Sequence, residues 1–225
     1  MSTQLTGNPL ARKIVMAVSG MAMVVFVGVH LLGNTSFFRG ASSLNAYAAT
    51  LQGLGPFLWI VRTALCAAAA LHIFYGVELT LENRAAKPQS YAVRKRLRST
   101  VSSRTMIWSG SVIGLFISYH LLHFTFHVFA PAISAGSLQD SSGRPDVFRM
   151  VYLNFQNNGI VALYLVGISA LLLHLTHGIE SMMQTLGLST EKTQPWIIRA
   201  GRILAVVIGL GLISIPIAVL SGAIR

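Results

Sequence analysis

The chain has 225 residues, of which 53% are hydrophobic and only 10% are charged. Soluble globular domains are about one-quarter charged, so this composition excludes an ordinary soluble protein and favours a membrane protein. The formal net charge of +11 would also suit a nucleic-acid-binding protein, and the placement of the charges along the chain decides between the two.

Five segments are apolar enough and long enough to cross a hydrocarbon core of roughly 30 Å. They cover residues of about 14–33, 57–81, 105–130, 158–186 and 200–223. The first is uncharged and no small-residue cleavage site follows it, so we expect this span to be retained rather than removed as a signal peptide. The predicted fold is an all-α membrane protein with five transmembrane helices in a single domain, residues 1–225.

The connections carry helix-start and turn signals. The sequence GLGP places Pro56 at the first position of the second helix, where its missing N–H costs nothing. We expect a basic loop over residues 83–104 and a polar, turn-rich loop over residues 131–157.

Basic residues gather on one side of this predicted topology. The side that holds the N-terminus receives Arg12, Lys13, Arg84, Lys87, Arg94, Lys95, Arg96, Arg98, Arg104, Lys192, Arg199 and Arg202. The other side receives Arg39, Arg62, Arg144, Arg149 and Arg225. This asymmetry fits the positive-inside rule and predicts a cytoplasmic N-terminus and an external C-terminus. The basic run RKRLR is therefore expected to contact lipid headgroups or a partner subunit, not nucleic acid.

Two stretches of the chain occur twice. LHIFYGVE at 71–78 is repeated as LHLTHGIE at 173–180, and FVGVHLLGN at 26–34 is similar to FISYHLLHF at 116–124. Helices one and two therefore echo helices three and four. The fifth span has neither a repeat nor a histidine, so we expect it to be scaffold.

All the histidines fall inside the first four spans, where polar groups are costly without a partner. They are His30, His72, His120, His123, His127, His174 and His177. At 1.5 Å per residue, His72 and His174 lie about 24 Å beyond the outer starts of their helices, in the inner half. Counting from the opposite end places His30 and His120 in the outer half. Each level then has two histidines from different helices, as needed to hold a flat macrocycle by both axial positions.

This arrangement predicts two bis-histidine haems b, the outer on His30 and His120 and the inner on His72 and His174. The single cysteine, Cys66, allows neither a Cys-x-x-Cys-His attachment nor a thiolate-rich zinc site, so haem would be held by coordination alone.

Several other residues are expected near the haems, and some alternatives remain open. Gly76 and Gly178 follow the inner histidines by four residues and leave room for a ring. His123 is the rival of His120 as a ligand, and with His127 at i,i+4 it leaves open a peripheral metal site. His177 is expected to form an interhelical hydrogen bond or to contact a haem propionate or quinone. Arg62 would pair with a propionate or extend to water.

The sequence as a whole resembles a known family. The HLLGN ending of the first span followed by LNAYA, the LYLVG and LHLTHG of the fourth, and the downstream QTLGL are similar to the di-haem cytochrome b subunit of succinate:quinone oxidoreductases. This group includes the succinate dehydrogenases and fumarate reductases that have a single five-helix anchor. The resemblance covers nearly the whole chain and implies the same ligand pairs, His30 with His120 and His72 with His174.

The resemblance also implies a function and partners. The chain would carry electrons between a cytoplasmic iron-sulfur subunit and membrane quinone, menaquinone or ubiquinone, in the cell's inner (cytoplasmic) membrane. Succinate and fumarate would be handled by a flavoprotein subunit, because this chain has no Gly-rich nucleotide loop and no cysteine cluster. Candidate quinone contacts are Asn45 and Tyr47 at the outer haem, and Ser19, His177 or Glu180 at the inner one.

Two alternative functions remain at this stage. The first is the cytochrome b anchor of another quinone-linked enzyme, a formate dehydrogenase or a hydrogenase, which would differ in its partner subunits. The second is a proton or small-solute transporter that uses the intramembrane histidines as relays, and this alternative predicts a colourless protein.

Overall fold

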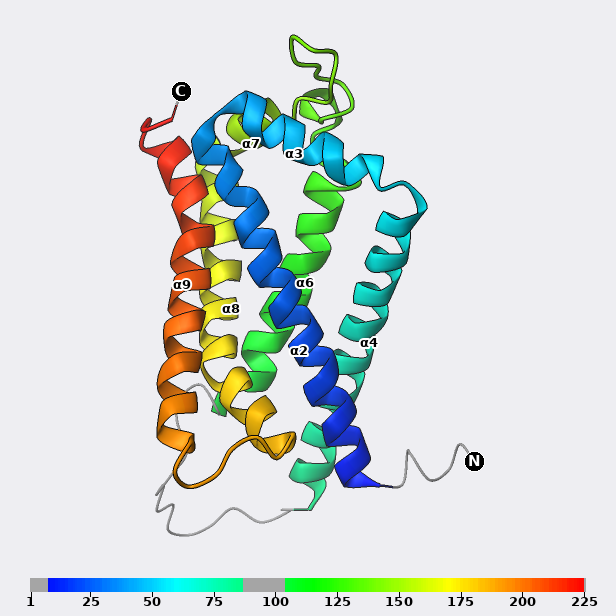
Figure 1. Ribbon diagram of the computed structural model, residues 1–225, viewed down its shortest axis with the longest axis vertical. Helices are drawn as coiled ribbons and strands as arrows, with labels where there is room; N and C mark the ends of the chain where they lie inside the picture. The colour runs from blue at the N-terminus through cyan, green and yellow to red at the C-terminus, as the bar shows by residue number, and fades with distance from the viewer. Residues whose placement is uncertain (1–7, 87–103, 225) are drawn as a thin grey trace.

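The computed structural model describes residues 8–86 and 104–224, and within these ranges the regular secondary structure is helical. Its long helices are α2 (Pro9–Asn34), α4 (Pro56–Ala85), α6 (Met106–Phe124), α8 (Asn158–Thr185) and α9 (Gln194–Leu220) (Figure 1). Each of these five is long and apolar enough to cross a membrane. The predicted all-α architecture with five spans, that of a multi-pass membrane protein, is therefore confirmed.

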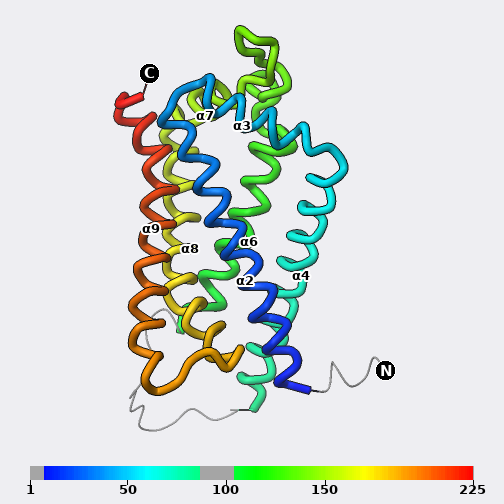
Figure 2. The backbone as a smooth tube through the Cα atoms, in the orientation of Figure 1, coloured from blue at the N-terminus to red at the C-terminus, as the bar shows by residue number. Residues whose placement is uncertain are grey.

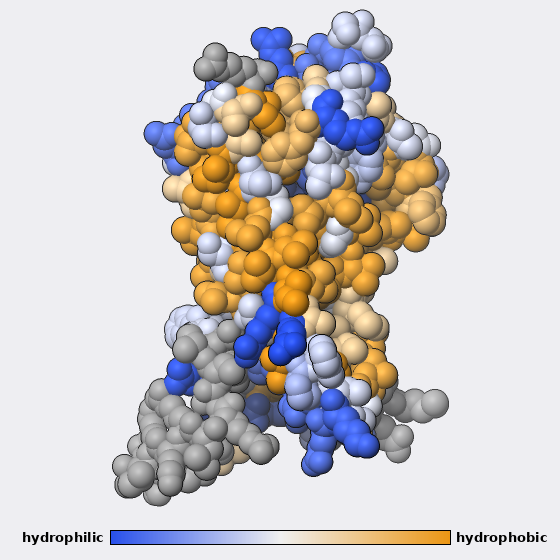
Figure 3. All heavy atoms as spheres, turned by 60° about the vertical axis from the view of Figure 1, so that its left-hand side comes forward, coloured by the Kyte–Doolittle hydropathy of each residue, from blue (hydrophilic) through white to orange (hydrophobic). Residues whose placement is uncertain are grey.

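The surface of the bundle is apolar along its middle. Figure 3 shows a hydrophobic band on one face, with hydrophilic residues gathered toward both ends. Helix α4 presents large apolar side chains outward, among them Trp59 at 63% exposure and Phe74 at 60%. A soluble monomer does not expose so large an apolar area, whereas hydrocarbon covers it without cost.

The two described ends of the chain lie at opposite ends of the bundle (Figure 2). We use "inner end" for the end that holds Pro9 and residues 186–193, and "outer end" for the end that holds residues 35–55 and 125–157. The basic run RKRLR at 94–98, Lys87 and Arg225 lie outside the described residues.

Helix α6 is shorter than the sequence predicted, since it ends at Phe124 and not near residue 130. A turn follows the helix. In this turn the Phe126 amide donates to the Leu121 carbonyl and the Val128 amide donates to the Leu122 carbonyl, both at 2.8 Å. His127 takes a left-handed φ of 56° in this turn. His123 and His127 therefore do not share a helix face, and the i,i+4 geometry on which a metal site there would depend is absent.

The outer end is covered by short helices that the sequence did not predict. They are η1 (Thr35–Arg39), α3 (Ala41–Gly53), η2 (Pro131–Ile133) and α7 (Val147–Phe155). Asn45 connects α3 to the start of α7. Its Nδ2 donates to Asp146 Oδ1 at 2.9 Å, and its Oδ1 accepts from the Phe148 amide at 2.9 Å. Residues 131–157 are thus a folded part of the outer cap and not only a loop.

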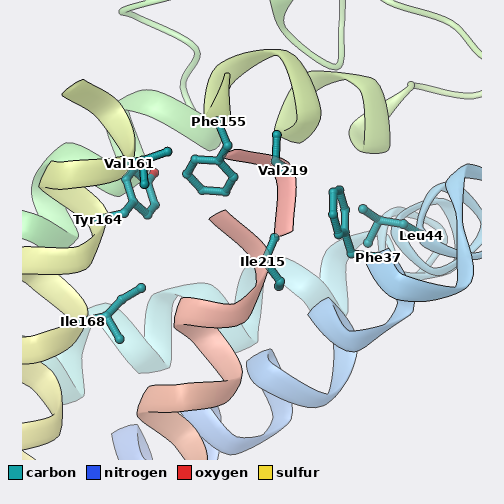
Figure 4. Close-up of a cluster of buried hydrophobic side chains, with 8 residues drawn as sticks. All are labelled: Phe37, Leu44, Phe155, Val161, Tyr164, Ile168, Ile215 and Val219. Carbon is teal, nitrogen blue, oxygen red and sulfur yellow. The ribbon is translucent and has the colours of Figure 1, made fainter. Parts of the chain in front are cut away.

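A buried apolar cluster fixes this cap to the bundle (Figure 4). Its members are Phe37, Leu44, Phe155, Val161, Tyr164, Ile168, Ile215 and Val219. Helix α9 packs mainly on α8 and also touches α2. Close approach is possible because Gly209 faces Leu172 and Gly201 faces Ile179 with little space between them. The fifth helix therefore supports α8 from the side.

Candidate functional site

The structure brings four histidines from four helices together as two pairs. His30 of α2 and His120 of α6 have ring centroids 5.9 Å apart, and His72 of α4 and His174 of α8 have centroids 6.2 Å apart. These are the pairs that counting along the helices grouped by depth. Each pair joins one helix of the first half of the repeat to one helix of the second half.

In the inner pair, both Nδ1 atoms are held by the neighbouring helix. His72 Nδ1 lies 3.0 Å from the Met16 carbonyl oxygen of α2. His174 Nδ1 lies 3.1 Å from Ser109 Oγ of α6. Nδ1 thus has a fixed partner in each ring, the arrangement by which metal-binding histidines are normally oriented.

Both inner rings lie against a glycine backbone. A Cβ atom on Gly20 would come within 3.1 Å of His72 Cε1, and one on Gly110 would come within 3.3 Å of His174 Cε1. These glycines were not predicted, yet the sequence contains a signal for them. The motif Met-x-x-Ser-Gly occurs at 16–20 and again at 106–110, ten residues before His30 and His120 respectively.

Gly76 and Gly178, which the sequence predicted to leave room for a macrocycle, lie beside methionines of the neighbouring helices. Added Cβ atoms on Gly76 and Gly178 would lie 4.0 Å from Met16 Sδ and Met106 Cε, which is ordinary contact. Gly76 and Gly178 therefore allow α4 and α8 to pass the methionines of α2 and α6, while Gly20 and Gly110 accommodate the imidazoles.

In the outer pair, the Nδ1 atom of His120 lies 3.2 Å from the Tyr164 hydroxyl of α8. Aromatic rings flank both histidines, with Phe26 stacked on His30 at 5.5 Å and Phe116 near His120 at 6.1 Å between centroids. The outer pair therefore lies in an aromatic environment.

His123 has protein partners on both ring nitrogens and is only 2% exposed. Its Nδ1 lies 3.1 Å from the Tyr164 hydroxyl and its Nε2 lies 2.8 Å from Asn154 Oδ1. An imidazole engaged on both sides has no lone pair left for a metal, which favours His120 over His123 as the ligand.

The other predicted residues have the following surroundings. Arg62 is exposed and stacks over the Trp59 ring at 5.0 Å, on the outside of α4. Glu180 accepts from Gln184 of its own helix at 3.2 Å. Ser19 is buried and donates to the Val15 carbonyl at 2.7 Å, and His177 is half-buried one turn after His174.

The two outer quinone candidates differ in their surroundings. Asn45 is 1% exposed and is fully engaged in the cap, so it offers no group to a ligand. Tyr47 lies so close to α2 that a Cβ on Gly33 would collide with its ring and hydroxyl. It lines a hollow of about 390 Å³ together with Val29, Leu32, Gly33, Thr35, Ser36 and Arg39.

The donor set suits haem better than a protein-only metal site. No group of three or more His, Cys, Asp or Glu side chains that could hold a metal ion occurs in residues 8–86 and 104–224. Two axial imidazoles with metal–nitrogen bonds of about 2 Å would place ring centroids roughly 6 Å apart, as in both pairs. Two imidazoles at this spacing, with Gly20 and Gly110 making room for the inner rings, fit a macrocycle that supplies the remaining ligands itself.

Comparison of the chain with protein-family models gives no match, and searches of curated proteins and of solved structures also give no match. The geometry of the two histidine pairs is therefore the basis for a functional proposal.

Proposed function

We propose that this chain is the di-haem cytochrome b anchor of a succinate dehydrogenase or fumarate reductase complex. Its role is to pass electrons between a cytoplasmic iron-sulfur subunit and membrane quinone. The observation that carries the proposal is the pair of histidine contacts at 5.9 and 6.2 Å, each made between two membrane-spanning helices.

The chain's own residues would hold and orient the haems. His30 and His120 would hold the outer haem, and His72 and His174 the inner one. The Met16 carbonyl, Ser109 and Tyr164 fix three of these rings through Nδ1. When bound, haem supplies reversible one-electron transfer at a potential that depends on ligand basicity, hydrogen bonding and burial.

The distribution of basic residues supports an orientation in which the inner end of the bundle faces the cytoplasm. Arg12 lies in the first turn of α2 and Arg104 lies two residues before α6, and Arg199 and Arg202 lie in the first three turns of α9 at the same end. This end would face the cytoplasm and receive the iron-sulfur subunit, whose own partner would be the flavoprotein.

The hollow beside Tyr47 supports a quinone site at the outer end. Its walls combine apolar Val29 and Leu32 with polar Thr35, Ser36 and Arg39, and it starts one residue from His30. An isoprenoid tail with a polar headgroup requires this combination of surfaces.

Absorption spectroscopy and potentiometric titration of the purified protein test the proposal. Two b-type reduction steps are expected, and His72→Ala and His174→Ala should remove the same step, while His30→Ala and His120→Ala remove the other. His177→Ala is the matched control and should keep both. Loss of different steps from His72→Ala and His174→Ala would overturn the pairing.

The same preparation separates the alternatives. A colourless protein would contradict the proposal and favour a transporter or a bare anchor. A haem-containing protein that co-purifies with formate dehydrogenase or hydrogenase subunits would keep the cytochrome and change the complex.

A further inference from the structure

A chain of hydrogen bonds connects His120 to the outer cap. It runs from His120 Nδ1 to the Tyr164 hydroxyl at 3.2 Å, from that hydroxyl to His123 Nδ1 at 3.1 Å, and from His123 Nε2 to Asn154 Oδ1 at 2.8 Å. Asn154 Nδ2 completes the chain with a bond to the Met150 carbonyl at 2.9 Å. Tyr164, His123 and Asn154 are 4%, 2% and 3% exposed, so water does not substitute for these contacts.

The direction of the chain is set at its cap end. A backbone carbonyl can only accept, so the group of Asn154 that faces Met150 must be the amide nitrogen. The Asn154 oxygen must then face His123, and an amide oxygen also only accepts. His123 therefore carries a proton on Nε2.

The protonation of the other His123 nitrogen follows from burial. A cationic His123 would need a compensating charge, and no salt bridge joins it to an acid in the part of the chain that the structure describes. Burying an unpaired charge is far more costly than burying the neutral ring. His123 is therefore neutral, and its bare Nδ1 accepts the proton of the Tyr164 hydroxyl.

The direction of the Tyr164 hydroxyl proton determines the tautomer of His120. Once this proton is directed to His123, the Tyr164 oxygen can serve His120 only as an acceptor. His120 must then carry its proton on Nδ1, which leaves Nε2 with a lone pair. The reverse arrangement would place two acceptors against each other at the His123 contact.

We infer that Asn154, His123 and Tyr164 are positioning residues that fix the tautomer of His120 and keep its Nε2 unprotonated for metal binding. The metal-binding role of His120 rests on the proposed function. The tautomers themselves follow from the hydrogen bonds and do not. An asparagine amide does not relay protons. The series of hydrogen bonds therefore orients His120 and does not conduct protons to it.

The repeat shows that this series of hydrogen bonds occurs in only one half of the protein. With the offsets that relate His30 to His120 and His72 to His174, Tyr164 corresponds to Arg62 and His123 to Gly33. Neither Arg62 nor Gly33 can reproduce the two links. Ser109 makes a contact of the same type, because its hydroxyl bonds to Nδ1 of His174 in the inner pair. A Ser109 variant is thus a suitable control for variants of the outer pair.

NMR of the reduced full-length protein with isotope-labelled histidine ring nitrogens tests the tautomers directly. His123, assigned by comparison with His123→Gln, should be protonated on Nε2 alone. In Asn154→Leu this preference should be lost, while Ser109→Ala should keep it. A proton on Nδ1, or on both nitrogens, in the unchanged protein would overturn the inference. This readout does not require haem, so a colourless protein would defeat the proposed function without deciding the tautomer.

Redox titration tests the consequence for the outer pair. Tyr164→Phe keeps the ring of the apolar cluster and removes the hydroxyl, so the outer step should shift and haem retention there should weaken about 10–100-fold. Asn154→Leu should act in the same sense with a smaller effect, and Ser109→Ala should move only the inner step. An unchanged outer step in Tyr164→Phe would contradict a positioning role, whereas two intact steps would leave the cytochrome function standing.

Discussion

The inner and outer histidine pairs come from the same sequence repeat but have different surroundings. In the inner pair, His72 and His174 each lie on a glycine and each bond to the equivalent stretch of a neighbouring helix, 16–20 or 106–110. In the outer pair, only His120 has a tyrosine partner, and that tyrosine is connected to the cap. The repeat therefore duplicates the histidines, while the outer cap, which is not repeated, makes the surroundings of the two pairs chemically distinct.

This difference has a physical origin in helix packing. At the inner level each imidazole lies against a glycine and bonds to a nearby residue of the neighbouring helix, so small residues allow the close approach and the geometry follows from the repeat. At the outer level α7 and the residues after α6 cover the bundle, and polar side chains there must find partners among themselves. Substitutions that affect one pair alone would show how far the two pairs are independent.

The largest effect is expected from Gly20→Leu. A Cβ atom alone would approach His72 Cε1 to 3.1 Å, so the larger side chain must displace the imidazole. The haem content measured from the reduced spectrum should fall from two to one per chain, with loss of the inner step. Gly28→Leu is the control on the same helix, because nothing lies within 4 Å of its Cβ position. Retention of both steps in Gly20→Leu would show that the inner ring does not depend on this glycine.

Gly167→Ala is expected to disturb the outer pair alone. Its Cβ would collide with the Phe116 ring, which packs against Tyr164 with centroids 5.1 Å apart and lies near His120. The outer haem should be retained about tenfold less well, as for a lost supporting contact, while the inner step stays in place. Gly114→Ala of α6, which has open space at its Cβ, should change neither step. An equal effect on both steps would argue against independent sites.

Arg12→Met should weaken the inner end without removing either histidine. Arg12 has a side chain only 6% exposed and bridges Glu78 at 3.2 Å and Glu82 at 2.6 Å, which ties α2 to α4. Its loss leaves Glu78 without its cation, so the unfolding temperature should fall, by about 2–4 °C for each kcal/mol lost. The double variant Arg12→Met, Glu78→Met should recover part of the loss. Lys13→Met, at an exposed position, serves as the control in the thermal melts.

The smallest effect concerns the pH response of the cap. Burial opposes ionisation of Asp140, but hydrogen bonds from the Arg144 side chain and from the Arg144 and Ser142 amides outweigh it and lower the pKa of Asp140 to about 2. A depressed folded-state pKa gives stability that is present above the unfolded value of about 4 and is lost as the pH falls toward 2.

Cleavage of the cap by pepsin, which is active over this range, measures the response. Cleavage should accelerate as the pH falls from about 4 to 2, while the redox steps should not follow it. Asp140→Asn should be cleaved readily throughout, and Glu191→Gln at the inner end should behave as the unchanged protein. A flat cleavage profile in the unchanged protein would contradict the role of Asp140.

Much of the architecture could be predicted because the bilayer imposes local rules. A span must be long, apolar and helical, so the five segments are visible in hydropathy alone. The grouping of His72 with His174 and of His30 with His120 needed only the helical rise, since a straight helix converts sequence distance into depth. The less regular ends were missed: α6 ends at Phe124, and α3 and α7 form a cap.

The amino-acid sequence by itself determined the number of spans, their approximate limits and the levels of four histidines, because each of these depends on distance along one helix. Only the tertiary structure decided that Gly20 lies against His72, that His123 is engaged on both sides, and that Tyr164 joins His120 to the cap. These contacts depend on how each helix is rotated about its own axis. In a span that is apolar all round, hydropathy does not record that rotation, and it is set by packing against the neighbouring helices.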